Sequence, residues 1–224
     1  EMMPLIEQIF EEEGQAESQT RLITEIHNQI TCRLIELGLG EMEKKGRGGT
    51  PSEFSWMGMG SEGRREQTVI TDQDNALIFK DPGPERLSQT RQWFLDFAEK
   101  VVSGLEICGF PRCRGNTMAI NPELCLTEEE WLKLFGGILE KPTPHALLKA
   151  GIYFDFRSLY GKHELVEKLR NMLMDLSPRS RLFLKLMSEN DLDAGRPPVQ
   201  QWGWKLRRLL GFGNLSVDCL LYTS

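Results

Sequence analysis

Two aspartates separated by one residue are the first candidates for chemistry in this chain. Asp72 and Asp74 lie in a segment expected to be extended, where side chains two positions apart point to the same side of a sheet. Neighbouring carboxylates repel each other unless a positive charge lies between them, and hard oxygen ligands suit Mg²⁺ or Mn²⁺. The pair therefore predicts a divalent metal site. A solvated or turn-capping pair is the alternative.

A Gly-Ser turn and two arginines precede the aspartates. Gly60 lets backbone N–H groups approach a phosphate closely, and Ser61 adds a hydroxyl donor. The guanidinium groups of Arg64 and Arg65 match phosphate oxygens in geometry, and we expect one of them to face the site. Their alternative is pairing with the neighbouring glutamates on a surface turn. Together with the aspartates, this segment predicts binding of a nucleoside triphosphate.

A third carboxylate, Asp155, lies in an apolar segment. Apolar and polar residues alternate over 152–157, which predicts a strand with Asp155 in its middle. Asp155 is therefore a candidate third metal ligand or general base. A structural ion pair with a nearby arginine is the alternative.

The other reactive residue types do not form a recognised motif. Cys108, Cys113 and Cys125 lack a CxxC spacing and have no histidine nearby, so we expect structural thiols rather than a zinc site. The three histidines lie far apart, and no nucleophile elbow, Walker loop or GxGxxG is present. A hydrolase triad and the common phosphate loops therefore lack support.

Hydrophobic spacing predicts the elements that position these residues, with Thr127 as the N-cap of one helix. The predicted elements are a helix over 18–45, strands over 54–59 and 75–79, helices over 85–108 and 131–139, and helices over 164–176, 179–190 and 200–210. We divide the chain into a helical lead-in over 1–50, a core over 51–160 and a helical substrate-binding domain over 161–224. Residues 214–224 lack the helical pattern, which suggests a frayed or truncated end.

Composition narrows the class of protein. The 224 residues are 40% hydrophobic, which is enough for a core, and carry a formal net charge of −6. An acidic chain is a poor partner for a phosphate backbone, so nucleic acid is an unlikely substrate. Five cysteines, an odd number, favour a reducing compartment, and no apolar run is long enough to span a membrane. We therefore expect a cytoplasmic protein.

The residues around the aspartates resemble a known family. Residues 60–68 and 71–78 are similar to the nucleotidyltransferase domains that occur beside cyclic-nucleotide-binding and CBS domains in bacterial signalling proteins. Those domains look like relatives of the protein-PII uridylyltransferase and glutamine-synthetase adenylyltransferase group. The resemblance continues through 109–113, 118–122 and 154–157, and it covers most of 22–187.

This resemblance implies a fold and an arrangement of the site. The fold would be α+β, with a nucleotidyltransferase core formed by a small mixed sheet flanked by helices. A long N-terminal helix would precede this core and a helical domain would follow it. Asp72 and Asp74 would be the metal-binding acids, Asp155 the third acid, and Gly60 with Ser61 the phosphate-binding turn.

The resemblance also implies an activity and partners. We expect Mg²⁺-dependent transfer of a nucleoside monophosphate from ATP or UTP to an acceptor hydroxyl, on a protein, in bacterial signal transduction. Cyclic-nucleotide-binding or CBS domains would lie upstream in a longer chain, and a homodimer stays open. The alternative is a regulatory module that binds nucleotide without catalysis.

Overall fold

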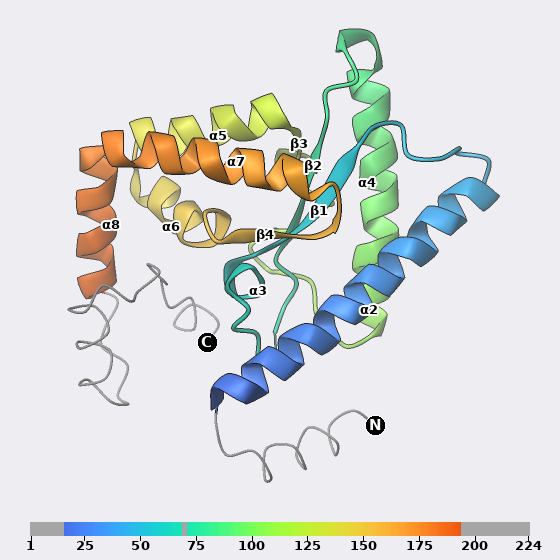
Figure 1. Cartoon of the computed structure of the whole chain (residues 1–224), viewed down its shortest axis with the longest axis horizontal. Helices are drawn as coiled ribbons and strands as arrows, with labels where there is room; N and C mark the ends of the chain where they lie inside the picture. The colour runs from blue at the N-terminus through green and yellow to red at the C-terminus, as the bar shows by residue number, and fades with distance from the viewer. Residues whose placement is uncertain (1–15, 69–70, 194–224) are drawn as a thin grey trace.

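The computed structural model describes residues 16–68 and 71–193, and it consists of one sheet between two groups of helices (Figure 1). In chain order the elements are α2 (Ala16–Lys44), β1 (Phe54–Met59), α3 (Gly60–Arg64), β2 (Asn75–Phe79), α4 (Pro84–Ile107), η1 (Pro122–Leu124), β3 (Cys125–Thr127), α5 (Glu128–Glu140), α6 (Pro144–Tyr153), β4 (Phe156–Gly161), α7 (His163–Leu176), η2 (Ser177–Arg179) and α8 (Arg181–Asp193). No helix in these described ranges is long and apolar enough to cross a membrane.

The sheet has four strands in the order β3-β2-β1-β4. β1 runs antiparallel to β2 and to β4, whereas β2 and β3 are parallel. Helices α2 and α4 lie on one side of the sheet, and α5, α6 and α7 lie on the other (Figure 1). The expected α+β fold, a small mixed sheet flanked by helices, is therefore confirmed.

The central strands contribute to two hydrophobic cores. In β1, Phe54 and Trp56 pack with the aromatic side chains of α4, while Met57 and Met59 point to α5 and α7. This alternation is the period of two that a strand imposes on its side chains. Because every residue of β1 and β2 is buried, polar groups that a ligand can reach are confined to the ends of these strands.

Most of the predicted elements are confirmed. The helices expected over 18–45, 85–108, 131–139 and 164–176 correspond to α2, α4, α5 and α7, and the strands expected over 54–59 and 75–79 are β1 and β2. Thr127 caps α5 in a capping box with Glu130, as expected. The helix predicted over 179–190 corresponds to α8, and the one over 200–210 lies outside the described residues.

The strand predicted over 152–157 is wrong. Helix α6 extends through Tyr153, and strand β4 begins only at Phe156, so Asp155 lies in the short connection between them. A helix start explains the difference, because Thr143 accepts a hydrogen bond from the Ala146 N–H and Pro144 occupies the first turn. Once the helix has begun, its backbone hydrogen bonds keep the chain helical through Tyr153, although apolar and polar residues alternate from residue 152 onward.

Candidate metal and nucleotide site

Asp72, Asp74 and Cys113 form a group that we call the acidic corner. One possible ligand atom from each of the three residues lies within 4.8 Å of the others. All three side chains are partly buried, and the aspartates lie directly before strand β2. The structure therefore brings the two predicted metal ligands together and adds a thiol, which the sequence analysis assigned to a purely structural role.

The residues that alternate with the two aspartates hold the Cys113 loop in place. The side-chain amide of Gln73, which is fully buried, donates hydrogen bonds to the backbone carbonyls of Val102 at 3.1 Å and Phe110 at 2.8 Å. Asn75 accepts one from the Ala119 N–H at 2.8 Å. The loop that starts at Phe110 is thus anchored at both ends against the start of β2.

Arg112 and Cys113 lie on different sides of this loop. Gln73 and Arg112 form an isolated parallel bridge, and the Arg112 guanidinium pairs with Glu99 at 2.6 Å and Glu106 at 2.9 Å on α4. Successive residues in extended backbone point in opposite directions. The cation is therefore directed to α4, and the thiol of Cys113 is directed to the acidic corner.

The three side chains of the acidic corner include no cation, and the nearby Arg64 guanidinium affects the pKa of Asp74 less than burial and Asp72 do. Burial, followed by the repulsion of Asp72, raises the pKa of Asp74 to about 7, and Asp74 Oδ1 has no hydrogen-bond partner within the described ranges. Burial and the Asp74 carboxylate raise the pKa of the Cys113 thiol to about 12. A divalent cation would relieve both effects, because it favours the charged forms of all three donors. The donor set therefore fits a divalent metal ion.

Gly60 forms the wall beside Asp74. It has a positive φ of 54°, and a Cβ atom built there would lie 3.2 Å from Asp74 Oδ2. A side chain at this position would thus be strained and would crowd the carboxylate. Ser61 follows at the start of α3 and is partly buried. The predicted phosphate turn therefore lies directly against one predicted metal ligand.

The two arginines of the turn have different surroundings. Arg64 donates hydrogen bonds to Asp155 Oδ2 at 2.7 Å and to Glu66 Oε2 at 2.8 Å, and only 10% of its side chain is exposed. Arg65 adopts a left-handed conformation at the end of α3 and is exposed. Of the two, Arg64 thus lies among the predicted site residues.

Asp155 takes part in this ion pair and is not among the donors of the acidic corner. Burial raises the pKa of Asp155, and the Arg64 guanidinium opposes that shift. The close approach of the two segments requires Gly63, because a Cβ there would lie 2.1 Å from the Asp155 carbonyl oxygen. The ion-pair alternative for Asp155 describes its geometry here, and its role as third acid stays a prediction.

A second acid, Glu62, lies on the inner side of α3. Its side chain is buried, with Oε1 2.9 Å from His27 Nδ1 on helix α2. Arg157 of β4 donates to the Glu62 carbonyl at 2.7 Å and to the Asn28 side chain at 2.7 Å. We call His27, Glu62 and Arg157 the turn base, because they tie the turn to α2 and β4.

Sequence reasoning missed Cys113 and the turn base as parts of this region. For Glu62 the sequence contains one signal, the glycine four residues before it. Gly58 leaves room for the Glu62 side chain, because a Cβ on Gly58 would lie 2.5 Å from Glu62 Cγ. For Cys113 and His27 the chain offers no local signal, because both reach the site through pairing of distant segments. Neither residue belongs to a recognised spacing.

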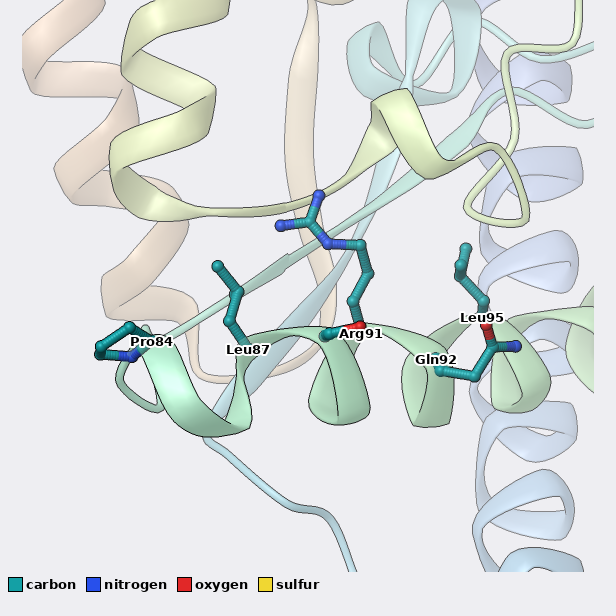
Figure 2. Close-up of a pocket in the computed structure, with 6 residues that line it drawn as sticks. Pro84, Leu87, Arg91, Gln92 and Leu95 are labelled. Atoms are coloured by element: carbon teal, nitrogen blue, oxygen red, sulfur yellow. The ribbon is translucent and has the colours of Figure 1, made fainter.

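Two surface depressions of the described part of the chain lie apart from the acidic corner. The one in Figure 2 lies along α4 and is lined by Pro84, Leu87, Ser88, Arg91, Gln92 and Leu95. Arg91 projects from α4 in the same direction as Leu87 and Leu95, and it pairs with Glu130 at 2.6 Å. None of the predicted site residues lines this depression.

No curated protein matches the chain. A family model does match, over residues 1–145, and its description is "Putative nucleotidyltransferase DUF294". The match includes the turn, the turn base up to Glu62 and the whole acidic corner, whereas Asp155 lies beyond it. Because the match covers well over half of the 224 residues, the chain belongs to this nucleotidyltransferase family.

Proposed function

We propose that the protein transfers a nucleoside monophosphate from a nucleoside triphosphate to an acceptor hydroxyl with Mg²⁺ as its metal. Nucleotidyl transfer in general follows from the family, and a nucleoside triphosphate is the substrate that this activity requires. The observation that supports the site is the contact between turn and acids, where Gly60 packs against Asp74 and the acidic corner has no cation of its own.

Each residue type has a role in this proposal. Asp72 and Asp74 hold the metal, which when bound neutralises phosphate charge and lowers the pKa of the acceptor hydroxyl. Backbone N–H groups at Gly60 and the Ser61 hydroxyl donate to the phosphates, and Arg64 stabilises the leaving pyrophosphate. Asp155 orients Arg64 and serves as the third acid or proton acceptor. Arg65 is exposed and is available to the triphosphate from outside.

The wider setting is also a proposal. We propose a protein as the acceptor, ATP or UTP as the donor, and a role in bacterial signal transduction together with upstream cyclic-nucleotide-binding or CBS domains. The division into a lead-in over 1–50, a core over 51–160 and a substrate-binding domain over 161–224 belongs to the same proposal. The acidic net charge of −6 supports a protein acceptor over nucleic acid.

Replacement of Asp74 tests the assignment. The chain is incubated with Mg²⁺, cell extract and each α-labelled nucleoside triphosphate, and labelled product and pyrophosphate are measured. We expect Asp74→Asn to lower transfer by about a thousandfold or more, because a metal ligand stabilises charge in the transition state. The matched control is Asp81→Asn, at the opposite end of β2, which should transfer normally. Full transfer by Asp74→Asn would overturn the assignment.

A regulatory module that binds nucleotide without catalysis is the second candidate. It is favoured by one observation, the engagement of Asp155 by Arg64 instead of by the acidic corner. Calorimetric titration with ATP and Mg²⁺ separates the two candidates when it is combined with the pyrophosphate measurement. Binding without release of pyrophosphate in the presence of extract supports the regulatory module.

A further inference from the structure

We propose that Cys113 is a third metal ligand, so that the acidic corner binds thiophilic divalent cations such as Zn²⁺ and Co²⁺ in competition with Mg²⁺. The inference rests on the proposed function in one respect, the use of Asp72 and Asp74 as metal ligands. It adds a thiol to a site expected to contain only oxygen donors, and it thereby predicts a metal preference.

The position of the thiol supports this assignment. Candidate donor atoms of the three side chains lie within 4.8 Å of one another, whereas two ligands of one tetrahedral ion are separated by roughly 3.3–3.8 Å. A small contraction of side chains would therefore close the site. The Cys113 loop is fixed by buried hydrogen bonds from Gln73 and to Asn75, so its backbone is already in place.

The surroundings of the acidic corner also leave a carboxylate oxygen free to bind a cation. Asp74 Oδ1 is buried and has no hydrogen-bond partner in the part of the chain that the structure describes, and its neighbour Asp72 is also an acid. On the other side, Gly60 leaves space against Asp74 Oδ2 that a side chain would occupy. The cation Arg112, adjacent to Cys113 in sequence, is directed to α4, so it does not neutralise the corner.

The other described cysteines are in different environments. Cys108 is exposed at the end of α4, Cys125 is buried in β3, and the thiol of Cys32 faces the Leu159 carbonyl oxygen at 3.5 Å. Within the described residues, Cys113 is the cysteine that joins carboxylates in a group of this kind. Cys108 therefore provides a matched control, five positions away on the same connection.

The chemistry of binding needs no further reactant. A metal–sulfur bond forms as the thiol proton leaves to solvent, and no atom changes oxidation state. Thiolate favours Zn²⁺ and Co²⁺, whereas carboxylates alone favour Mg²⁺. A thiophilic ion held by all three side chains would occupy the position that Mg²⁺ needs, so Zn²⁺ is expected to inhibit transfer.

Absorption spectroscopy with Co²⁺ tests the proposal without nucleotide. The full chain is titrated with CoCl₂ under reducing conditions, and the near-ultraviolet sulfur-to-Co²⁺ charge-transfer band is followed. We expect the band in the wild-type chain and in Cys108→Ser, and its loss in Cys113→Ser. Affinity for Co²⁺ should fall by about tenfold or more in Cys113→Ser, a loss that even outer-shell partners of a metal can cause.

Competition between Co²⁺ and Mg²⁺ is measured on the wild-type chain, so its result does not depend on whether the Cys113→Ser variant folds. Excess Mg²⁺ should reduce the Co²⁺ band of the wild-type chain, because both ions use the same carboxylates. Absence of the band in the wild-type chain, or an unchanged band in Cys113→Ser, would overturn the proposal. Pyrophosphate release with Mg²⁺ is measured separately, so failure of the Co²⁺ test and failure of nucleotidyl transfer are distinguishable.

Discussion

The acids on the two sides of the α3 turn have different neighbours. In the turn base, Glu62 has His27 at 2.9 Å and Arg157 bound to its own backbone carbonyl. In the acidic corner, Asp74 faces a second aspartate. Among the described residues, Glu62 Oε1 and Asp74 Oδ1 both lack a hydrogen-bond partner, so the two regions differ in the charge beside the acid. Glu62 is the more deeply buried acid, yet it is the one that has a nearby base.

We infer from this difference that a neighbouring base, rather than the degree of burial, would separate a structural acid from a metal-binding acid. A buried carboxylate with a base beside it can stabilise the folded chain. Two neighbouring carboxylates without a cation between them lower the free energy of unfolding, and a bound cation would remove this cost. The cost in the acidic corner is the kind of strain that binding sites retain. Three substitutions test the contrast, in order of decreasing expected effect.

The largest effect is expected at Gly63, between the two regions. Gly63→Ala places a Cβ 2.1 Å from the Asp155 carbonyl oxygen, so α3 must move away from β4. We expect the free energy of unfolding to fall by about 3 kcal/mol, the upper range for overpacking. Denaturant unfolding measures it. Gly136→Ala in α5 is the control, because its Cβ meets no described residue within 4 Å and alanine favours a helix. Equal stability of the two variants would contradict the prediction.

The second prediction concerns the acidic corner and pH. Asp74 has a pKa of about 7 in the folded chain, above the ordinary value of 3.8 expected for the unfolded chain. Between these two pKa values, ionisation of Asp74 therefore lowers the free energy of unfolding more and more as pH rises, and above pH 7 the loss stays constant. Asp74→Asn removes this cost. Without metal, we expect its stability advantage over the wild-type chain to grow by about 2 kcal/mol between about pH 5 and about pH 8.

Chemical denaturation in a chelating buffer at both pH values checks this second prediction. Addition of Mg²⁺ should stabilise the wild-type chain and leave Asp74→Asn unchanged, because only the former retains both carboxylates. An advantage of Asn that is constant across pH would show that the Asp74 carboxylate has a normal pKa.

The smallest effect is expected in the turn base. Glu62→Gln keeps the shape of the side chain but removes the charge beside His27, so we expect a loss of about 1–2 kcal/mol. Glu66→Gln is the matched control, because it removes the Arg64 partner that is 48% exposed and should cost less than about 0.5 kcal/mol. Thermal unfolding of both variants measures the difference, and a larger loss for Glu66→Gln would reverse our assignment of the two acids.

Much of the fold was predictable because local rules dominate it. The helical spacing of α2, α4, α5 and α7, and the apolar runs of β1 and β2, are patterns that a buried face imposes on the sequence. The strand over 152–157 failed because a helix and a strand can both use the same apolar residues there. The cap formed by Thr143 and Pro144 was the local signal that distinguishes them.

Of the candidate site, the sequence by itself determined the turn at Gly60 and the aspartate pair at 72 and 74, since both lie within one short segment. The tertiary structure decided which groups accompany them. Arg64 meets Asp155 across 91 positions, and Cys113 reaches the aspartates through buried hydrogen bonds from Gln73. Such contacts depend on how β2, α4 and β4 pack, and no periodicity or motif spacing encodes them locally.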